Sequence, residues 1–198
     1  MDVLEAVLKR ADTPVHLVAH SFGAWIALAL AMRRTPKLLS MTLLEPTAFQ
    51  LLGLRGESAL SQEVDAMTDR YMTEWKIGNQ QAVRHVIDFY GNAGTFDGYP
   101  PAVQEKLISQ TPTNILDWKS GYADSTKLAD LAAVKVPTLV VCGRASHKAM
   151  QRCNQLLVDH LPQAKIMMLE GANHFMIASH ASDLTHAIER HIRAVGLD

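Results

Sequence analysis

The sequence predicts an α/β fold in which helices cover both faces of a mostly parallel sheet, so that the molecule has three layers. Short apolar runs rich in β-branched residues alternate with segments of helical periodicity, which is typical of strands joined by crossover helices. The first strand, helix and strand occupy residues 15–44, about the length of a βαβ unit. We therefore expect parallel strands whose carboxyl ends lie at one edge of the sheet.

The first part of this core lies before residue 49. Apolar residues recur at helical spacing over residues 3–8, and the helix ends before Pro14 because proline cannot continue it. Residues 15–19, Val-His-Leu-Val-Ala, are mostly apolar, as in a strand covered on both faces. A helical pattern follows over residues 22–32, and residues 41–44 predict a second strand.

The second part of the core follows residue 131. Its predicted elements alternate in type: strand 136–143, helix from about 149 to 160, strand 165–169 and closing helix from about 182 to 195. We therefore assign residues 1–48 and 132–198 to one α/β core.

The segment between these two parts is predicted to be a helical lid inserted into the core. Over residues 49–131 the strand signal disappears, and helical patterns are interrupted only by Gly-Asn-Ala-Gly at 91–94 and by two prolines at 100–101. The segment is rich in aromatic residues, among them Trp75, Phe89 and Trp118. These three side chains either form the segment's own core or line an apolar substrate pocket, and we take them as candidate substrate-binding residues.

The charge balance excludes several classes of partner. Lysine and arginine total 19 against 20 for aspartate and glutamate, which gives a net charge of -1 without long runs of either sign. Such a surface does not favour nucleic acid or anionic membranes. The longest apolar stretch, residues 24–32, is too short to span a bilayer, and the first residues lack the pattern of a signal peptide. We expect a cytoplasmic protein without membrane contact.

Metal and disulfide chemistry have little support in the sequence. The only two cysteines are Cys142, inside a predicted buried strand, and Cys153, and we expect both to be reduced thiols. The nine histidines show no HExxH spacing, and no paired CxxC occurs. We therefore expect neither a metal nor a cofactor, and a small molecule as the substrate.

Ser21 is the candidate nucleophile. It lies in Ala-His-Ser-Phe-Gly at residues 19–23, between a predicted strand and a predicted helix. Such a turn lifts a serine hydroxyl towards a base that can take its proton. The turn is expected to need small residues at Ala19 and Gly23, where strand and helix crowd together. The backbone N–H of Phe22, at the start of the helix, is the predicted oxyanion donor.

Three motifs together resemble the α/β-hydrolase superfamily, in particular its serine esterases and lipases. Residues 15–28 resemble the nucleophile strand, turn and helix, residues 136–143 resemble a later strand, and Glu-Gly-Ala-Asn-His-Phe at 170–175 resembles the loop of the catalytic histidine. The resemblance implies that His174 is the general base and then the general acid, because the loop after a parallel strand brings it to the edge where Ser21 lies.

The acid of the implied triad has more than one candidate. Many family members place an aspartate three residues beyond the glycine that matches Gly143, but here that residue is Ser146. Glu45 directly follows the strand at 41–44, a position that other members use, and keeps the order serine, acid, histidine. Its alternative role is to cap or salt-bridge a strand end, and Asp124 and Asp130 are further candidates for the acid.

The resemblance also implies that the fold is truncated at its N-terminus. A whole family member has eight strands, and the first four would precede residue 1, together with the His-Gly loop that supplies a second oxyanion donor. The strand at 15–19 would then be an exposed apolar edge. We therefore expect a homo-oligomer, and a monomeric mass by light scattering at micromolar concentration would contradict this expectation.

Two hypotheses about function follow. The first is an esterase-like serine hydrolase that acts on a small, mostly apolar ester or acyl substrate through an acyl-serine intermediate. The second is a catalytically impaired, truncated hydrolase fold that binds a ligand or partner without turnover. Ser146 at the usual acid position and the absence of the N-terminal strands both favour it. Related proteins also cleave carbon–carbon bonds or carry out halide-dependent oxidation with the same serine.

Overall fold

The computed structural model describes residues 2–33 and 37–196 of the chain. Met1, residues 34–36 and residues 197–198, which the predicted core segments include, lie outside the described residues. Four strands form one parallel sheet in sequence order: β1 (Val15–His20), β2 (Leu38–Leu44), β3 (Thr138–Gly143) and β4 (Ala164–Leu169). The predicted strands are all present, within one to three residues of their expected bounds.

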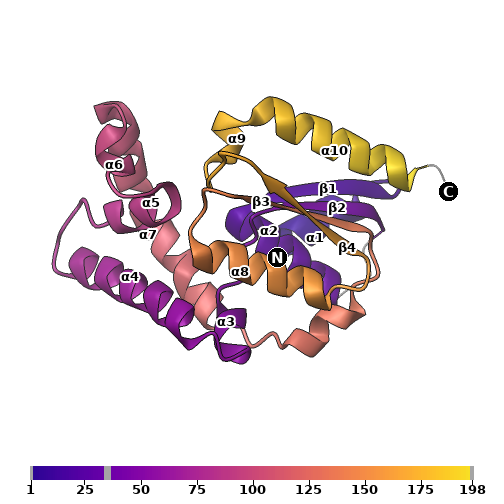
Figure 1. Ribbon diagram of the computed structural model, residues 1–198, viewed down its shortest axis with the longest axis horizontal. Coiled ribbons are helices and arrows are strands. Elements are labelled where there is room, and N and C mark those ends of the chain that lie inside the picture. The colour runs from indigo at the N-terminus through magenta and orange to yellow at the C-terminus, as the bar shows by residue number, and fades with distance from the viewer. Residues whose placement is uncertain (1, 34–36, 197–198) are drawn as a thin grey trace.

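Helices cover both faces of this sheet, so the prediction of a three-layer α/β fold is confirmed (Figure 1). On one face lie α1 (Asp2–Lys9), α2 (Ser21–Arg33) and α8 (Lys148–His160), and on the other lies α10 (Ala181–Val195), with the short α9 (Met176–Ser179) before it.

Successive side chains along each strand pack alternately against the helices on the two faces of the sheet. Leu43 and Val140 belong to the apolar cluster that includes α2 and α8, whereas Leu44 and Val141 belong to the cluster that includes Leu184 of α10. Neighbouring residues on a strand point to opposite faces, which explains why the strands are apolar throughout rather than alternately apolar and polar.

The parallel pairing brings the carboxyl ends of the strands together. His20 pairs with Leu44, and Gly143 pairs with Leu169. The loops that begin after these four residues therefore leave the sheet at the same edge, which is where an open α/β sheet holds its ligands.

The segment 49–131 is helical, as expected. It contains α3 (Gln50–Leu54), α4 (Ser58–Lys76), α5 (Arg84–Gly91), α6 (Thr95–Gly98), α7 (Pro101–Tyr122) and a short 3-10 helix, η1 (Leu128–Ala133). Helices α4 to α7 gather to one side of the sheet, at the left of Figure 1. They share an apolar cluster of their own around Tyr71, Val86 and Phe96, whereas Phe49 and Leu131, near the two ends of the segment, pack into the main core. The division into core and lid stays a prediction.

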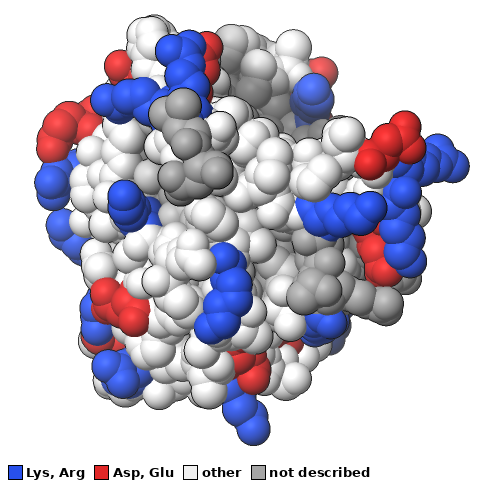
Figure 2. Space-filling model, turned by 90° about the vertical axis from the view of Figure 1, so that its right-hand side faces the viewer, with Lys and Arg blue, Asp and Glu red and all other residues white. Residues whose placement is uncertain are grey.

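The outer surface agrees with the charge balance of the sequence. On the face shown in Figure 2, basic and acidic side chains are interspersed. Strand β1 forms an edge of the described sheet, and Val18 on it is 42% exposed; self-association through this edge stays a prediction. Within the described ranges, no helix has the length and apolar character needed to cross a membrane.

Candidate active site

Ser21 lies on a strained turn between strand and helix. Strand β1 ends at His20 and α2 begins at Ser21, and the Ser21 backbone has a φ of 58°. This left-handed conformation costs a non-glycine residue roughly 1–3 kcal/mol and persists only where the surrounding structure enforces it. Here the packed strand and the buried α2 enforce the turn. The Phe22 N–H lies in the first turn of α2, where backbone N–H groups have no acceptor within the helix, so it is free to bind an oxyanion.

The expectation that crowding requires a small residue at Gly23 is wrong. A Cβ atom added to Gly23 would meet no heavy atom within 4 Å, so crowding between strand and helix does not explain the glycine at this position. The small residue that the site does require is Gly143, at the end of β3. A Cβ there would collide with the backbone carbonyl of Ala172 and would approach the Ser146 hydroxyl. Glycine therefore lets the loop after β3 pack against the loop after β4.

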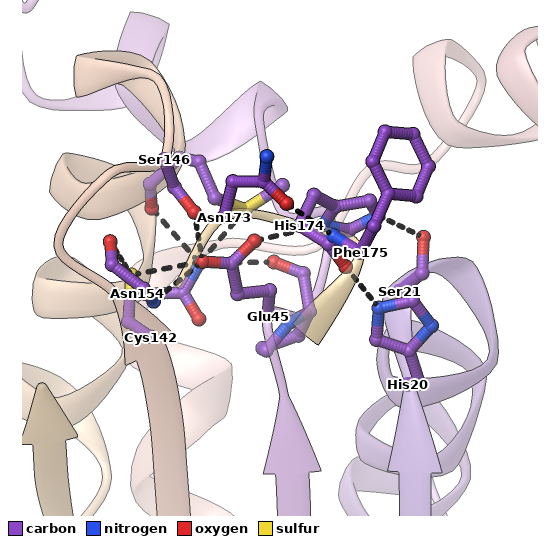
Figure 3. A network of polar contacts seen from close by, with 12 residues as sticks. His20, Ser21, Glu45, Cys142, Ser146, Asn154, Asn173, His174 and Phe175 are labelled. Carbon is purple, nitrogen blue, oxygen red and sulfur yellow. Dashed lines mark hydrogen bonds and ion pairs between the residues drawn. The ribbon is translucent and has the colours of Figure 1, made fainter. Parts of the chain in front are cut away.

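His174 bridges Ser21 and the sheet edge (Figure 3). It follows β4, is only 3% exposed, and its Nε2 lies 2.8 Å from the Ser21 Oγ. The ring is held on both sides: the Tyr90 ring stacks on it at a centroid distance of 4.0 Å, and the His20 ring lies 4.7 Å away. His20 also donates from Nε2 to the His174 carbonyl, over 3.0 Å. The imidazole is therefore fixed in place before any substrate binds.

Glu45 is the carboxylate that contacts His174. It is fully buried, directly after β2, with a φ of 43°. Its Oε2 accepts a hydrogen bond from His174 Nδ1 over 2.8 Å. Its Oε1 accepts from the Gly143 N–H over 2.7 Å and from the Ser146 hydroxyl over 2.5 Å. Because Nδ1 donates to Glu45, Nε2 accepts from the Ser21 hydroxyl.

The ionised form of Glu45 is favoured by these partners. Burial by itself would raise the pKa of the Glu45 carboxyl, but the hydrogen bonds and charge of His174, together with those from Ser146 and Gly143, lower the pKa below its usual value. Glu45 is therefore the candidate acid that contacts His174. Ser146, at the usual acid position, donates a hydrogen bond to Glu45.

The two other candidate acids lie elsewhere. Asp124 accepts from the backbone N–H of Thr126 over 2.7 Å, and Asp130 accepts from the backbone N–H of Lys127 over 2.8 Å. Both carboxylates therefore stabilise turns of the chain.

His20, next to Ser21, is held neutral. Burial, followed by the nearby charge of His174, lowers the pKa of His20 from 6.5 to about 4. Sequence reasoning did not assign a role to this residue, because the position before a nucleophilic serine tolerates many residue types. Its hydrogen bond to the His174 carbonyl and its contact with the His174 ring identify it as part of the site.

A small open pocket of about 70 Å³ lies over Ser21 and Phe22. One face of α7 forms much of its lining: Asn114, Asp117, Trp118, Gly121 and Tyr122. These residues follow the spacing i, i+3, i+4, i+7 and i+8, which places them on one side of a helix. The spacing places these residues on one face of the helix, but only the packing of α7 decides that this face lines the pocket. A larger hollow of about 730 Å³, between α1 and α2, contains none of the residues discussed above.

The structure places the three predicted substrate-binding residues differently. Trp118 lines the pocket. Phe89 packs edge-on against Phe49 and contacts the His147 ring, and Trp75 packs against the separate cluster of the helical segment. Neither Phe89 nor Trp75 is among the residues that line the pocket.

The cysteines are free and buried, as expected. Burial raises the pKa of the Cys153 thiol to about 12, so this side chain behaves as an apolar group. In the part of the chain that the structure describes, no three histidine, cysteine or acidic side chains are grouped as metal ligands would be.

A parallel sheet flanked by helices, with a serine on a strained turn and a histidine and carboxylate on neighbouring loops, is the arrangement found in α/β-hydrolases. A model of the alpha/beta hydrolase family matches residues 1–187, and the chain belongs to this family.

The chain is similar in sequence to two bacterial esterases. The chain is 29% identical over 191 residues to a pimeloyl-[acyl-carrier protein] methyl ester esterase of Neisseria meningitidis, covering 89% of this chain and 69% of the relative. It is 28% identical to the esterase of the same name from a second strain, of which it spans only 56%.

Solved structures of low sequence identity share the fold. An alpha/beta hydrolase from a Medee basin deep-sea metagenome library matches with a TM-score of 0.73 at 17% identity, over 96% of this chain and 70% of that one. MenH from S. aureus matches with a TM-score of 0.71 at 15% identity, over 98% of this chain and 74% of that one.

Proposed function

We propose that the chain is a serine esterase that hydrolyses a small ester through an acyl-serine intermediate, with Ser21 as nucleophile, His174 as base and Glu45 as the acid of the triad. The observation that carries this proposal is the unbroken chain of hydrogen bonds from the Ser21 hydroxyl to His174 and on to Glu45, 2.8 Å at each step. A serine hydroxyl is a weak nucleophile until such a base takes its proton.

The reaction proceeds in two halves. His174 Nε2 takes the proton of Ser21 as Oγ attacks the ester carbonyl carbon, and the Phe22 N–H donates to the resulting oxyanion. The tetrahedral intermediate collapses when the leaving alcohol receives the proton from His174, which leaves an acyl group on Ser21. A water molecule then gives one proton to His174 and attacks the acyl carbon. The second tetrahedral intermediate collapses as His174 returns that proton to the Ser21 Oγ, which releases the carboxylic acid and the free serine.

Glu45 contributes charge rather than proton transfer. A buried carboxylate beside Nδ1 holds the imidazole in the productive tautomer and stabilises the imidazolium that forms in each half-reaction. Its own hydrogen bonds from Gly143 and Ser146 keep it ionised and in place.

The relatives support an ester as substrate, since those described above are methyl ester esterases. The size of the pocket over Ser21 supports a small acyl or alcohol group. Phe22, Phe49 and Trp118 supply the apolar part of its lining.

The alternative of a binding protein without turnover loses one of the two observations that favoured it. Ser146 occupies the usual acid position, but its hydroxyl donates to Glu45. Glu45, at the end of the neighbouring strand, supplies the carboxylate that the usual position lacks. Ligand binding without turnover is therefore an outcome that the experiment below distinguishes.

The proposal is tested with a fluorophosphonate probe and a series of p-nitrophenyl esters. We expect the purified protein to be labelled and to hydrolyse short-chain esters, and Ser21→Ala to abolish both. Ser109→Ala, which removes an exposed hydroxyl that bonds only the Lys106 carbonyl, is the matched control and should retain both. Absence of labelling and of turnover in the folded wild-type protein would overturn the proposal in favour of a binding function.

A further inference from the structure

The pocket over Ser21 contains a carboxylate without a partner. Asp117 lines this pocket from α7, yet within the described ranges it accepts no hydrogen bond and forms no ion pair. Asp97 and Asp65 of the helical segment, by contrast, are engaged by Arg84 and by Tyr122. Burial raises the pKa of the Asp117 carboxyl above its ordinary value, which means that its charge is partly removed from water and not compensated by the protein.

The rest of the pocket wall offers this carboxylate no cation. No lysine, arginine or histidine is among the residues that line the pocket. The side chain of Asn114, on the same helix face, is uncharged, and its Oδ1 accepts a hydrogen bond from the Tyr71 hydroxyl over 3.0 Å. Its amide hydrogens can donate, but they cannot neutralise the charge of Asp117.

A second polar group of the pocket also lacks a partner. The Nε2 atom of Gln50, another lining residue, has no hydrogen-bond acceptor among the described residues, but it is buried and exposes no surface to the pocket. Asp117, which is only partly buried, is therefore the unpaired group that a ligand in this pocket can reach.

We propose that this pocket selects esters that carry an ammonium group, which Asp117 binds. This inference rests on the proposed function, because it concerns the substrate of Ser21. It revises the mostly apolar substrate expected from the sequence: the apolar walls contact the methylene groups, and the charged end is recognised by Asp117. An anionic group in the same place would be repelled by the carboxylate.

The test compares isosteric esters that differ only in charge. p-Nitrophenyl esters of ω-ammonium acids are matched against their neutral alkyl analogues, and ω-ammonium alcohol esters form a second arm that separates recognition of the acyl part from recognition of the alcohol part. We expect kcat/KM of the wild type to favour the ammonium ester in one arm by about tenfold, which corresponds to about 1.4 kcal/mol.

Variants of Asp117 assign the preference to this residue. Asp117→Asn should abolish the preference for the ammonium ester, because the amide keeps the shape of the side chain but not its charge. Asp117→Lys should shift the preference towards anionic esters. Glu105→Gln, which removes the same charge from an exposed position on α7 outside the pocket, is the matched control and should keep the wild-type preference.

Binding is measured separately from turnover. Calorimetric titration of Ser21→Ala with the same ester pair should give tighter binding of the ammonium ester, again lost in the double variant with Asp117→Asn. A wild type that hydrolyses neutral esters without charge preference overturns this inference and leaves the proposed function intact. A protein that prefers the ammonium ester in binding but turns over neither ester overturns the proposed function alone.

Discussion

Two carboxylates of the candidate site have opposite surroundings. Glu45, at the end of β2, is fully buried, and both of its oxygens accept hydrogen bonds from groups fixed by the fold. Asp117, on α7, is partly exposed and has no partner in the part of the chain described. The pKa of Glu45 is accordingly lowered by its partners against the effect of burial, whereas burial raises the pKa of Asp117.

The difference follows from where each group can find compensation. A charge inside the core cannot reach water, so the fold must supply every partner or the charge is lost. A charge at a pocket wall keeps part of its hydration until a ligand replaces it. A carboxylate with a full set of partners, such as Glu45, suits a fixed role in catalysis. A carboxylate without partners among the described residues, such as Asp117, suits reversible recognition of a substrate.

The largest effect is expected from Glu45→Gln. The amide keeps the shape of the side chain but removes the charge that stabilises the imidazolium, and we expect kcat to fall about 10⁴-fold, as for a triad carboxylate changed to its amide. The measurement is steady-state hydrolysis of a short neutral ester. Glu189→Gln, an exposed change on α10, is the control, and a loss of less than tenfold in Glu45→Gln would remove Glu45 from the triad.

His20→Gln tests the neutral group beside the base through the pH dependence of stability. The folded protein keeps His20 neutral down to about pH 4, whereas the unfolded chain binds a proton near pH 6.5. The unfolded state therefore binds more protons between these values, and the free energy of unfolding falls as the pH falls through this window, by at most about 3 kcal/mol.

Glutamine retains a donor for the His174 carbonyl but does not titrate. We expect the wild type to lose more stability on acidification than His20→Gln, as measured by urea unfolding across the window. Parallel pH profiles for the two proteins would show that the burial of His20 does not hold its pKa down.

Gly143→Ala tests the packing on which the surroundings of Glu45 depend. The added methyl group collides with the Ala172 carbonyl, and overpacking of this kind costs about 1–3 kcal/mol. Urea unfolding of the variant should show this loss, whereas Gly98→Ala, where a Cβ meets nothing within 4 Å, should not. Equal stabilities would mean that the two loops separate without cost.

The smallest effect is expected from Ser146→Ala. Glu45 Oε1 loses one donor but keeps the Gly143 N–H, so kcat should fall by about tenfold, the worth of one hydrogen bond to a charged group. Because the Ser146 hydroxyl lowers the pKa of Glu45, the acid limb of the kcat profile should move to higher pH. Ser109→Ala is again the control, and an unchanged acid limb would reduce Ser146 to a packing role.

Much of the fold and part of the site were predictable from the sequence. The strands and helices of the core were expected within a few residues, because buried parallel strands are apolar throughout and helices repeat every 3.6 residues. Ser21 and His174 were expected to face one another, since each follows a strand of the same sheet. The choice of the acid among Glu45, Asp124 and Asp130 was open, because the usual acid position holds Ser146.

The pocket was the least predictable part. Trp75, Phe89 and Trp118 are chemically alike in the sequence, and only the packing of the helical segment decides that Trp118 lines the pocket while Trp75 lies in a separate cluster. Asp117 drew no interpretation, because an aspartate on a helix is commonly solvated.

The sequence by itself determined the order of layers, the strained turn at Ser21 and the loop of His174, because these depend on local periodicity and on the shared direction of parallel strands. Only the tertiary structure decided which oxygens and nitrogens meet. Glu45 lies between His174 and Ser146, residues 129 and 101 positions away in the chain, and Asp117 lies in the pocket of Ser21. Contacts of this range depend on how the loops pack against one another, and no local pattern of residues encodes them.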